Sequence, residues 1–373
     1  MMKKSNWIQI FLFCLFLAGF FVLNLCTPDR DFSEQENRYL QLRPKFSCRE
    51  LFFGDYTSKF ETYTTDQFPF RDSWISLKAR SEILLGKKEN NGVYLCPGNT
   101  LIKPFSEPDE QLLETNINAV NLLTEHAGCP VYLTLVPGAS ETWADKLPKN
   151  APNASQTAVI DTVRARTEAQ YIDLTDALAA HAEEPIYYRT DHHWTTLGAY
   201  YGYSALMQAM ELQPLPLESF HRRIVSDSFC GTSWSSSGFS WVPPEQIETF
   251  VEETDAVHVT NYPSGKPVEG RMYHDEFLGQ KDKYSYFWGG NTPLLQITTA
   301  HTDAPALLIL RDSYMDCLSP FLTEHFSRID ILDLRYYRTS LQTYLQEHDF
   351  DAVLVCYSVS NFCTDSSVYL AGR

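Results

Sequence analysis

The residues most able to do chemistry in this chain lie together in residues 188–196, which read Tyr-Arg-Thr-Asp-His-His-Trp-Thr-Thr. A carboxylate beside an imidazole is the orienting half of a nucleophilic triad, in which the histidine accepts the proton. In an extended strand, side chains two residues apart point the same way, so Asp191 is expected to face His193 while His192 points to the other side. This geometry favours His193 as the base.

The nucleophile must come from elsewhere, and Ser313 is the best candidate because it follows the apolar run of residues 306–310. Open α/β sheets place their ligand sites at the carboxyl ends of strands. A helix that begins there also offers unpaired N–H groups for the oxyanion of an acyl intermediate. A serine that only caps the helix is the alternative interpretation. Together with Asp191 and His193, Ser313 is expected to form a catalytic set for serine acyl transfer.

Two glycines precede Asn291, and glycines let a backbone approach a ligand closely, so Gly290 and Asn291 are candidate oxyanion contacts. A plain turn explains the same residues. Arg189 and Arg311 flank the two catalytic segments, either as substrate contacts or as structural ion pairs. Trp194 is either a packing residue or a surface on which a sugar ring stacks.

A metal site formed by Asp191, His192 and His193 is an alternative to the triad. Neighbouring histidines on an extended strand diverge, and no third His, Glu or Asp cluster has ligand spacing. The nine cysteines form no CxxC or zinc-ligand pattern, and they fit buried thiols or one or two disulfides. No metal and no cofactor are therefore expected.

The N-terminal region contains an almost uninterrupted apolar run, Ile8 to Leu25, which is long enough to span a bilayer. Lys3 and Lys4 precede it and predict a cytoplasmic N-terminus, with the remaining chain outside the membrane. A signal peptide that is cleaved is the alternative. The residues before Cys26 lack the small side chains that signal peptidase prefers, which favours a retained anchor.

The composition limits the class of partner. The formal net charge is -17, from 30 basic and 47 acidic side chains, so no basic surface is expected for neutralising the phosphates of a nucleic acid. A neutral glycan is compatible with this charge.

Beyond the apolar run, strand-like and helix-like segments alternate, which predicts an α/β fold with a mostly parallel sheet flanked by helices. The interpretation divides the chain into residues 1–26 as cytoplasmic stub and transmembrane anchor, 27–105 as an aromatic-rich spacer, and 106–373 as the catalytic domain. Residues 213–303 are rich in Ser, Thr, Gly and Trp, and we expect an insertion with β character there.

The motif Asp191-His192-His193-Trp194 within residues 188–200 resembles the signature of the bacterial DHHW protein family. Sequences of that family also resemble residues 33–38, 66–72 and 92–95, so the likeness covers most of the chain. The family is similar to the alginate O-acetylation proteins, in which an Asp and a His precede a serine that follows a strand. Two differences from those proteins are His192 in place of a threonine and Arg311-Asp312 in place of Gly-Thr.

The resemblance implies an SGNH-hydrolase-like, flavodoxin-like domain with Asp191 as acid, His193 as base and Ser313 as nucleophile. It implies an extracytoplasmic O-acetyltransferase for a cell-surface polysaccharide, with acetyl supplied by a multispanning membrane acyltransferase. A carbohydrate acetylesterase would use the same triad. The two differences, His192 within the motif and Arg311-Asp312 before Ser313, motivate a further alternative. In it the chain is a non-catalytic glycan-binding or assembly protein.

Overall fold

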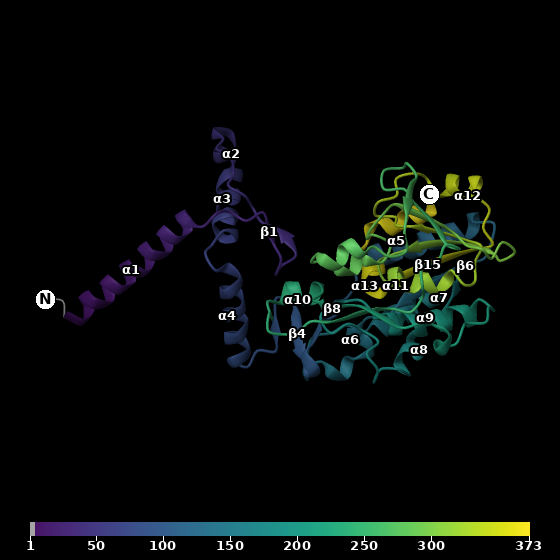
Figure 1. Ribbon diagram of the computed structural model, residues 1–373, viewed down its shortest axis with the longest axis horizontal. Helices are drawn as coiled ribbons and strands as arrows, with labels where there is room; N and C mark the ends of the chain where they lie inside the picture. Colours follow the sequence, from purple (N-terminus) through teal and green to yellow (C-terminus); the bar gives the residue numbers. More distant parts are fainter. Residues whose placement is uncertain (1–3) are drawn as a thin grey trace. The chain divides into compact units, whose positions relative to one another are not determined.

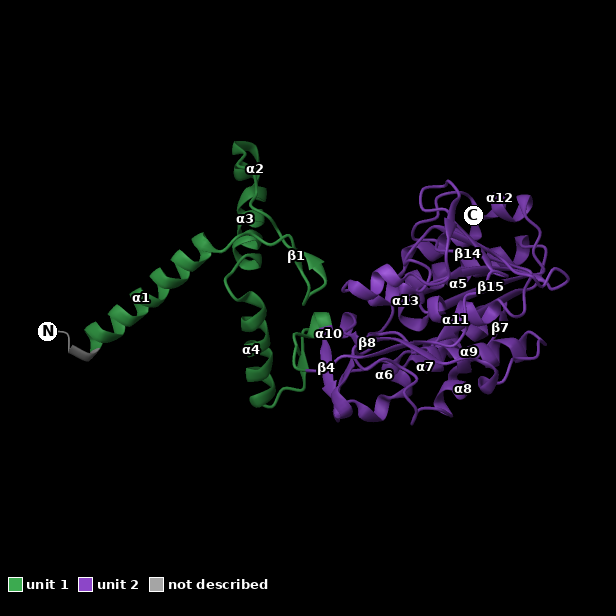
Figure 2. Ribbon diagram, in the orientation of Figure 1, with its two compact units in different colours: residues 1–91, 235–241 green, residues 92–234, 242–373 purple. Residues whose placement is uncertain are grey.

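The computed structural model describes residues 4–373 (Figure 1), so Lys3 of the expected cytoplasmic stub lies outside the described residues. The chain forms two compact units (Figure 2). The smaller contains the described residues up to Asn91 and the segment Ser235–Trp241, and the larger contains Gly92–Trp234 and Val242–Arg373. The expected ranges 27–105 and 106–373 remain a proposal about domain organisation.

The smaller unit begins with helix α1, Lys4–Cys26, which includes the predicted apolar run. Its segment Asn6–Cys26 is long and apolar enough to cross a membrane, as a transmembrane helix or a signal sequence would be. Ser47 caps the next helix by accepting a hydrogen bond from the backbone N–H of Glu50. The remaining elements are β1 Phe32–Ser33, β2 Arg38–Tyr39, α2 Cys48–Phe53, α3 Asp55–Asp66, α4 Arg71–Leu84 and β3 Glu89–Asn90.

The larger unit is a mixed α/β structure built on one eight-stranded sheet, in the order β11-β10-β12-β14-β13-β15-β6-β7. Adjacent strands from β14 to β7 are parallel, as the buried apolar runs predict. The strands are β6 Val131–Val136, β7 Gln170–Tyr171, β10 His258–Asn261, β11 Val268–Gly270, β12 Leu294–Thr298, β13 Ala306–Arg311, β14 Arg328–Leu332 and β15 Ala352–Ser358.

Helices cover both faces of this sheet, because alternate residues of each strand point to opposite sides. On β13, Leu307 and Ile309 belong to the core cluster that contains Phe321, whereas Leu308 and Leu310 belong to the one that contains Val120. The helices are α5 Glu110–His126, α6 Ala139–Thr142, α7 Gln156–Arg166, α8 Thr175–Ala179, α9 Thr196–Ala209, α11 Met315–Leu322, α12 Leu341–Glu347 and α13 Val359–Thr364.

The region expected as an insertion, residues 213–303, contributes directly to the sheet. Strands β10, β11 and β12 extend its edge beyond β14 in antiparallel pairing. The region also forms a hairpin from β8 Arg223–Phe229 and β9 Glu245–Thr249, and it contains the short helix α10 Thr232–Ser237. A second hairpin, β4 Val93–Cys96 with β5 Thr100–Ile102, precedes α5.

Candidate active site

The segment that carries the two histidines is a bent loop rather than the extended strand expected from the sequence. An antiparallel bridge between Tyr187 and Trp194 closes the loop, and the N–H of Tyr188 donates to the carbonyl of His193 at 3.1 Å. The bend turns both imidazoles toward Asp191. The expectation that His192 points away is therefore wrong, because it assumed a period-two strand.

The loop and the turn after β13 bring Asp191, His193 and Ser313 together. Nδ1 of His193 lies 2.5 Å from Oδ1 of Asp191, and Nε2 of His193 lies 2.7 Å from Oγ of Ser313. Asp191 and His193 are buried, whereas Ser313 is partly exposed. The three side chains form a continuous hydrogen-bonded series that ends at Ser313, a partly exposed residue. Such an arrangement can activate a serine for attack on a carbonyl.

Residues of the β-rich region fix the Asp191 carboxylate from its other side. The backbone N–H of Thr232 donates to Oδ2 of Asp191 at 2.6 Å, and the Thr232 hydroxyl donates to the same oxygen at 3.0 Å. A Cβ on Gly231 would lie 2.2 Å from that oxygen, so only glycine fits there. These donors leave Oδ1 of Asp191 for the two imidazoles, and Nδ1 of His193 lies nearer to it, at 2.5 Å, than Nδ1 of His192, at 3.3 Å.

Ser313 lies in the turn between β13 and α11, where the sequence predicted a strand end and a helix start. The preceding carboxylate, Asp312, is fully surrounded by donors. Its Oδ2 accepts from the N–H and hydroxyl of Ser358, both at 2.8 Å, and from Nδ2 of Asn361 at 2.7 Å. Its Oδ1 accepts from the N–H of Tyr314 at 3.0 Å. Asp312 thereby ties the turn of Ser313 to the end of β15.

Tyr284 covers the face of the His193 ring. The two rings are stacked, with centroids 4.0 Å apart and planes 12° apart. The Tyr284 hydroxyl donates to the carbonyl of Ser313 at 3.3 Å. One side chain from the β-rich region therefore contacts both the base and the backbone of the nucleophile.

The ionisation of the two imidazoles depends on the carboxylate between them. Burial raises the pKa of Asp191, but the two imidazoles outweigh this effect and hold it well below its ordinary value. Burial and the positive charge on His192 lower the pKa of His193. Burial also opposes protonation of His192, but Asp191 raises its pKa overall. At neutral pH, His193 is thus the neutral imidazole that a general base must be.

Trp194 is a packing residue in this fold. It is fully buried, and its indole N–H donates to the carbonyl of Tyr314 at 2.8 Å. Gly202 of α9 makes room for the ring, since a Cβ there would lie 2.8 Å from it. The indole thus connects the histidine loop to the turn of Ser313, and no surface for a sugar ring remains on it.

The guanidinium of Arg189 donates to the carbonyls of Gly98 and Pro244 rather than to a member of the triad. Its backbone N–H and that of Thr190 donate to the carboxylate of Glu245, at 2.8 and 2.6 Å. Its guanidinium lines a separate cavity of about 830 Å³ that also contains Trp143 and Lys146. Burial raises the pKa of Glu245, and the two N–H donors partly offset this rise.

The other sequence candidates are not brought to Ser313. Arg311 is 1% exposed and its Nη1 lies 2.8 Å from Oδ1 of Asp316, so it belongs to a buried ion pair and does not face a substrate. The side-chain oxygen of Asn291 accepts from Arg335 at 3.3 Å. A Cβ on Gly290 would lie 2.8 Å from the hydroxyl of Ser285, as in a tight turn.

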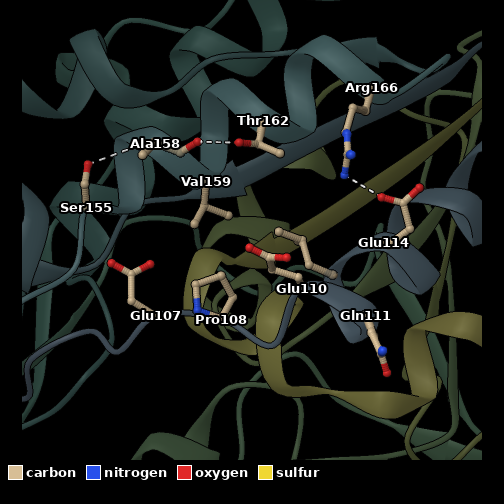
Figure 3. Close-up of a pocket in the computed structure, with 11 residues that line it drawn as sticks. Glu107, Pro108, Glu110, Gln111, Glu114, Ser155, Ala158, Val159, Thr162 and Arg166 are labelled. Atoms are coloured by element: carbon tan, nitrogen blue, oxygen red, sulfur yellow. Dashed lines mark hydrogen bonds and ion pairs between the residues drawn. The ribbon is translucent and has the colours of Figure 1, made fainter.

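A small polar cavity of about 330 Å³ adjoins the triad. Its lining includes His192, Tyr314 and Asn361, and the exposed side chains of Lys103 and Ser360. A larger cavity of about 930 Å³ lies between α5 and α7 (Figure 3), where Glu107, Glu110 and Glu114 line it. The lining of that cavity contains no member of the triad, whereas Asp191 lines the small cavity.

Asp191, His192 and His193 also place one ligand atom each within 4.8 Å of one another, which a metal ion could use. The divergence of the histidines expected from the sequence is therefore wrong. Both nitrogens of His193 have protein partners, however, and both oxygens of Asp191 accept hydrogen bonds. The donors present fit an oriented imidazole better than a metal ligand.

Comparison with known proteins identifies the family. The sequence profile of the DHHW protein family matches residues 105–332. The chain belongs to the DHHW protein family.

Two proteins of solved structure share its fold. This DHHW protein is similar to a DHHW family protein from Eubacterium siraeum, with 22% identity and a TM-score of 0.67 over 76% of this chain and 96% of that one. It is also similar to PatB1 of Bacillus cereus with a sulfonyl adduct, with 20% identity and a TM-score of 0.63 over 74% and 97% of the two chains. At these identities the likeness is one of fold.

A curated relative of this DHHW protein is the probable alginate O-acetylase AlgJ of Pseudomonas putida. The two are 25% identical over 180 residues, which cover 44% of this chain and 46% of the relative. The DHHW protein thus spans about half the length of that relative.

Three residues around the site of this DHHW protein were not found from the sequence: Thr232, Tyr284 and Glu245. Thr232 lies in residues 213–303, the region rich in Ser, Thr, Gly and Trp, but nothing in the sequence connected it with Asp191. Tyr284 and Glu245 carried no signal, because each acts through a contact between distant segments.

Proposed function

We propose that this protein is a serine-dependent O-acetyltransferase that acts outside the cytoplasm on a cell-surface polysaccharide. The observation that carries the proposal is the continuous hydrogen-bonded series from Asp191 through His193 to the partly exposed hydroxyl of Ser313. The name of the relative AlgJ, an alginate O-acetylase, supports the chemistry. The fold, in this proposal, is SGNH-hydrolase-like, and residues 106–373 are its catalytic part.

In the first half-reaction, Nε2 of His193 takes the proton of the Ser313 hydroxyl as Oγ attacks the carbonyl carbon of an acetyl donor. The tetrahedral intermediate collapses, the bond between the acetyl group and its carrier breaks, and His193 returns the proton to the departing carrier. The enzyme is left as acetyl-Ser313. Asp191 keeps the Nδ1 proton of His193 in place throughout.

In the second half-reaction, His193 takes a proton from a sugar hydroxyl as that oxygen attacks acetyl-Ser313. The ester to Ser313 breaks, its oxygen regains a proton from His193, and the acetylated sugar leaves. If water attacks instead, the same residues perform acetylester hydrolysis. Access of sugar or water to the cavity beside Ser313 therefore decides between transferase and esterase.

The negative charge of each tetrahedral intermediate requires hydrogen-bond donors near Ser313. The backbone N–H of Ser313 makes no hydrogen bond with the described part of the chain, and it is the donor we assign to the oxyanion. The neighbouring N–H of Tyr314 donates to Asp312 and is not free for this role.

We also propose that α1 is a retained single-pass anchor, with its N-terminus in the cytoplasm and both compact units outside. A multispanning membrane acyltransferase would then supply the acetyl group at the outer surface of the membrane. In this arrangement the acetyl group reaches Ser313 from a membrane protein rather than from a soluble carrier.

The test uses the full chain in lipid nanodiscs, an aryl acetate as donor and an acceptor saccharide. Wild-type protein should release the aryl alcohol and acetylate the saccharide, and Ser313→Ala should lower the rate by about a thousandfold or more. Ser360→Ala is the matched control, because Ser360 is exposed in the same cavity but lies outside the hydrogen-bonded series. Equal slow rates for wild type and Ser313→Ala would favour the non-catalytic reading, and turnover without sugar acetylation would favour the esterase.

A further inference from the structure

Exposed apolar side chains are concentrated in the segment between α1 and the larger unit. Residues 27–91 expose 13 large hydrophobic side chains, whereas residues 92–373 expose only five although they are four times as many. Single exposed apolar residues are ordinary, but such a concentration marks a surface that something apolar covers. The most exposed side chains among them are Tyr39, Phe46, Phe52, Phe53, Phe70, Leu84 and Leu85.

The balance of acidic and basic side chains also changes at residue 91. Residues 27–91 contain 11 acidic and 11 basic side chains, whereas residues 92–373 contain 36 acidic and 17 basic ones. An anionic membrane surface repels the second set and not the first. The neutral segment is therefore the part of this chain that can lie against lipid headgroups.

Contacts with α1 fix which residues of this segment lie level with the C-terminal end of the apolar helix. Phe20 stacks on Phe68, with ring centroids 5.5 Å apart, and lies 5.9 Å from the ring of Trp74. The side chain of Asn24 donates to the carbonyl of Gln67 at 3.4 Å. Phe20 is six residues before Cys26, the last residue of α1, which is about 9 Å along a helix axis. Phe68 and Trp74 thus contact the last two turns of the apolar helix.

The side chains level with the end of α1 are of the kinds that are enriched at bilayer interfaces. Phe68 and Trp74 are about four-tenths exposed and Phe70 about two-thirds. The indole N–H of Trp74 donates to the carbonyl of Pro69 at 3.2 Å, so its ring can enter an apolar region without an unpaired donor. Tryptophan and other aromatic residues are enriched where hydrocarbon meets headgroups.

We propose that the junction between α3 and α4, with Phe68, Phe70 and Trp74, inserts into the outer headgroup region of the membrane that α1 spans. This inference rests on the proposed membrane anchor and concerns a surface, not the acetyl-transfer site. The occupant is lipid. Interfacial elements of this kind bury their apolar side chains about 5–10 Å into the headgroup boundary. The larger unit would then be joined to a segment that lies on the membrane.

The experiment places a polarity-sensitive thiol fluorophore at single positions of the full chain in anionic nanodiscs whose lipids are brominated near the headgroup end of the acyl chains. Three cysteines are compared: Phe70→Cys in the junction, Leu15→Cys in the middle of α1, and Leu122→Cys as a matched exposed position of the larger unit. The background replaces by serine the native cysteines that are not buried: Cys14, Cys26, Cys48, Cys129 and Cys230.

The label at Phe70→Cys should show blue-shifted emission and a severalfold greater loss of emission to the brominated lipid than the label at Leu122→Cys. Thermal unfolding of each labelled protein checks that it is folded. A Phe70→Cys label as water-exposed as that of Leu122→Cys, with a Leu15→Cys label shielded from water, would overturn this proposal and leave the anchor intact. A water-exposed label at Leu15→Cys would instead refute the anchor itself.

Discussion

The ring of Tyr284 lies flat against the imidazole of His193, with centroids 4.0 Å apart and planes 12° apart. His193 is thus held on three sides: by Asp191 at Nδ1, by Ser313 at Nε2 and by an aromatic face. A base whose ring cannot tilt keeps its lone pair aimed at the nucleophile, and small losses of alignment are costly in catalysis.

Removing this stacked ring should lower kcat without abolishing folding. Tyr284→Leu should reduce kcat for aryl acetate about tenfold, because the imidazole gains freedom to rotate. Tyr284→Phe keeps the ring, loses the 3.3 Å hydrogen bonds of the hydroxyl to the Ser313 carbonyl and to Sγ of Cys317, and should stay close to wild type. Steady-state kinetics and thermal unfolding, measured on both variants, separate alignment from stability. Equal kcat for the leucine and phenylalanine variants would show that the stack has no role.

The pH dependence of activity should report the neighbouring histidine. The His192 and His193 ring centroids lie 3.8 Å apart, and the positive charge on His192 adds to burial in lowering the pKa of His193. Activity needs neutral His193, so it should fall as the pH drops through that lowered pKa. His192→Asn removes the charge, raises the pKa of His193 and should move the acidic limb of the kcat/KM profile to higher pH.

At alkaline pH the His192→Asn and wild-type rates should converge, because His193 is neutral in both. The same substitution removes the hydrogen bond between His192 and Thr232. Thr232→Val serves as the comparison, because it removes this hydrogen bond and the one from the Thr232 hydroxyl to Asp191 but keeps the charge of His192. An acidic limb that stays in place in His192→Asn, or moves to lower pH, would contradict the electrostatic account.

The strand that leads to Ser313 should depend on one buried ion pair. Arg311 and Asp316 are both almost fully buried, and burial raises the pKa of Asp316 to about 7 although Arg311 opposes the rise. Asp316→Asn leaves the guanidinium without its counter-charge and should cost about 3–5 kcal/mol of unfolding free energy. The double variant Arg311→Met, Asp316→Leu should recover most of this loss. Chemical denaturation of the wild type, the single variants and the double variant measures these free energies. If the losses of the two single variants simply add in the double variant, Arg311 and Asp316 do not stabilise each other.

Much of the fold could be predicted because its signals are local. The apolar run at residues 306–310 predicted the strand β13, and Ser313 lies two residues after the end of that strand. The mostly parallel sheet follows from the alternating strand-like and helix-like segments.

The shape of the histidine loop could not be predicted, because distant contacts fix it. Glu245 accepts the N–H groups of residues 189 and 190, and Thr232 holds the Asp191 carboxylate, at sequence separations of about 40 to 56 residues. A local strand pattern therefore placed His192 on the wrong side. Arg311 and Asn291 were candidates by position in the sequence alone, and their partners, Asp316 and Arg335, lie in other elements.

The most direct test of the central claim is to trap the acyl-enzyme. Wild-type protein is mixed with an aryl acetate in the absence of an acceptor sugar, quenched in acid after a short interval and digested for peptide mass spectrometry. An acetyl group should appear on the peptide that contains Ser313, be absent in Ser313→Ala, and form about a thousandfold more slowly in His193→Ala. Acetate release or sugar acetylation at the wild-type rate without any acetyl group on Ser313 would contradict the account.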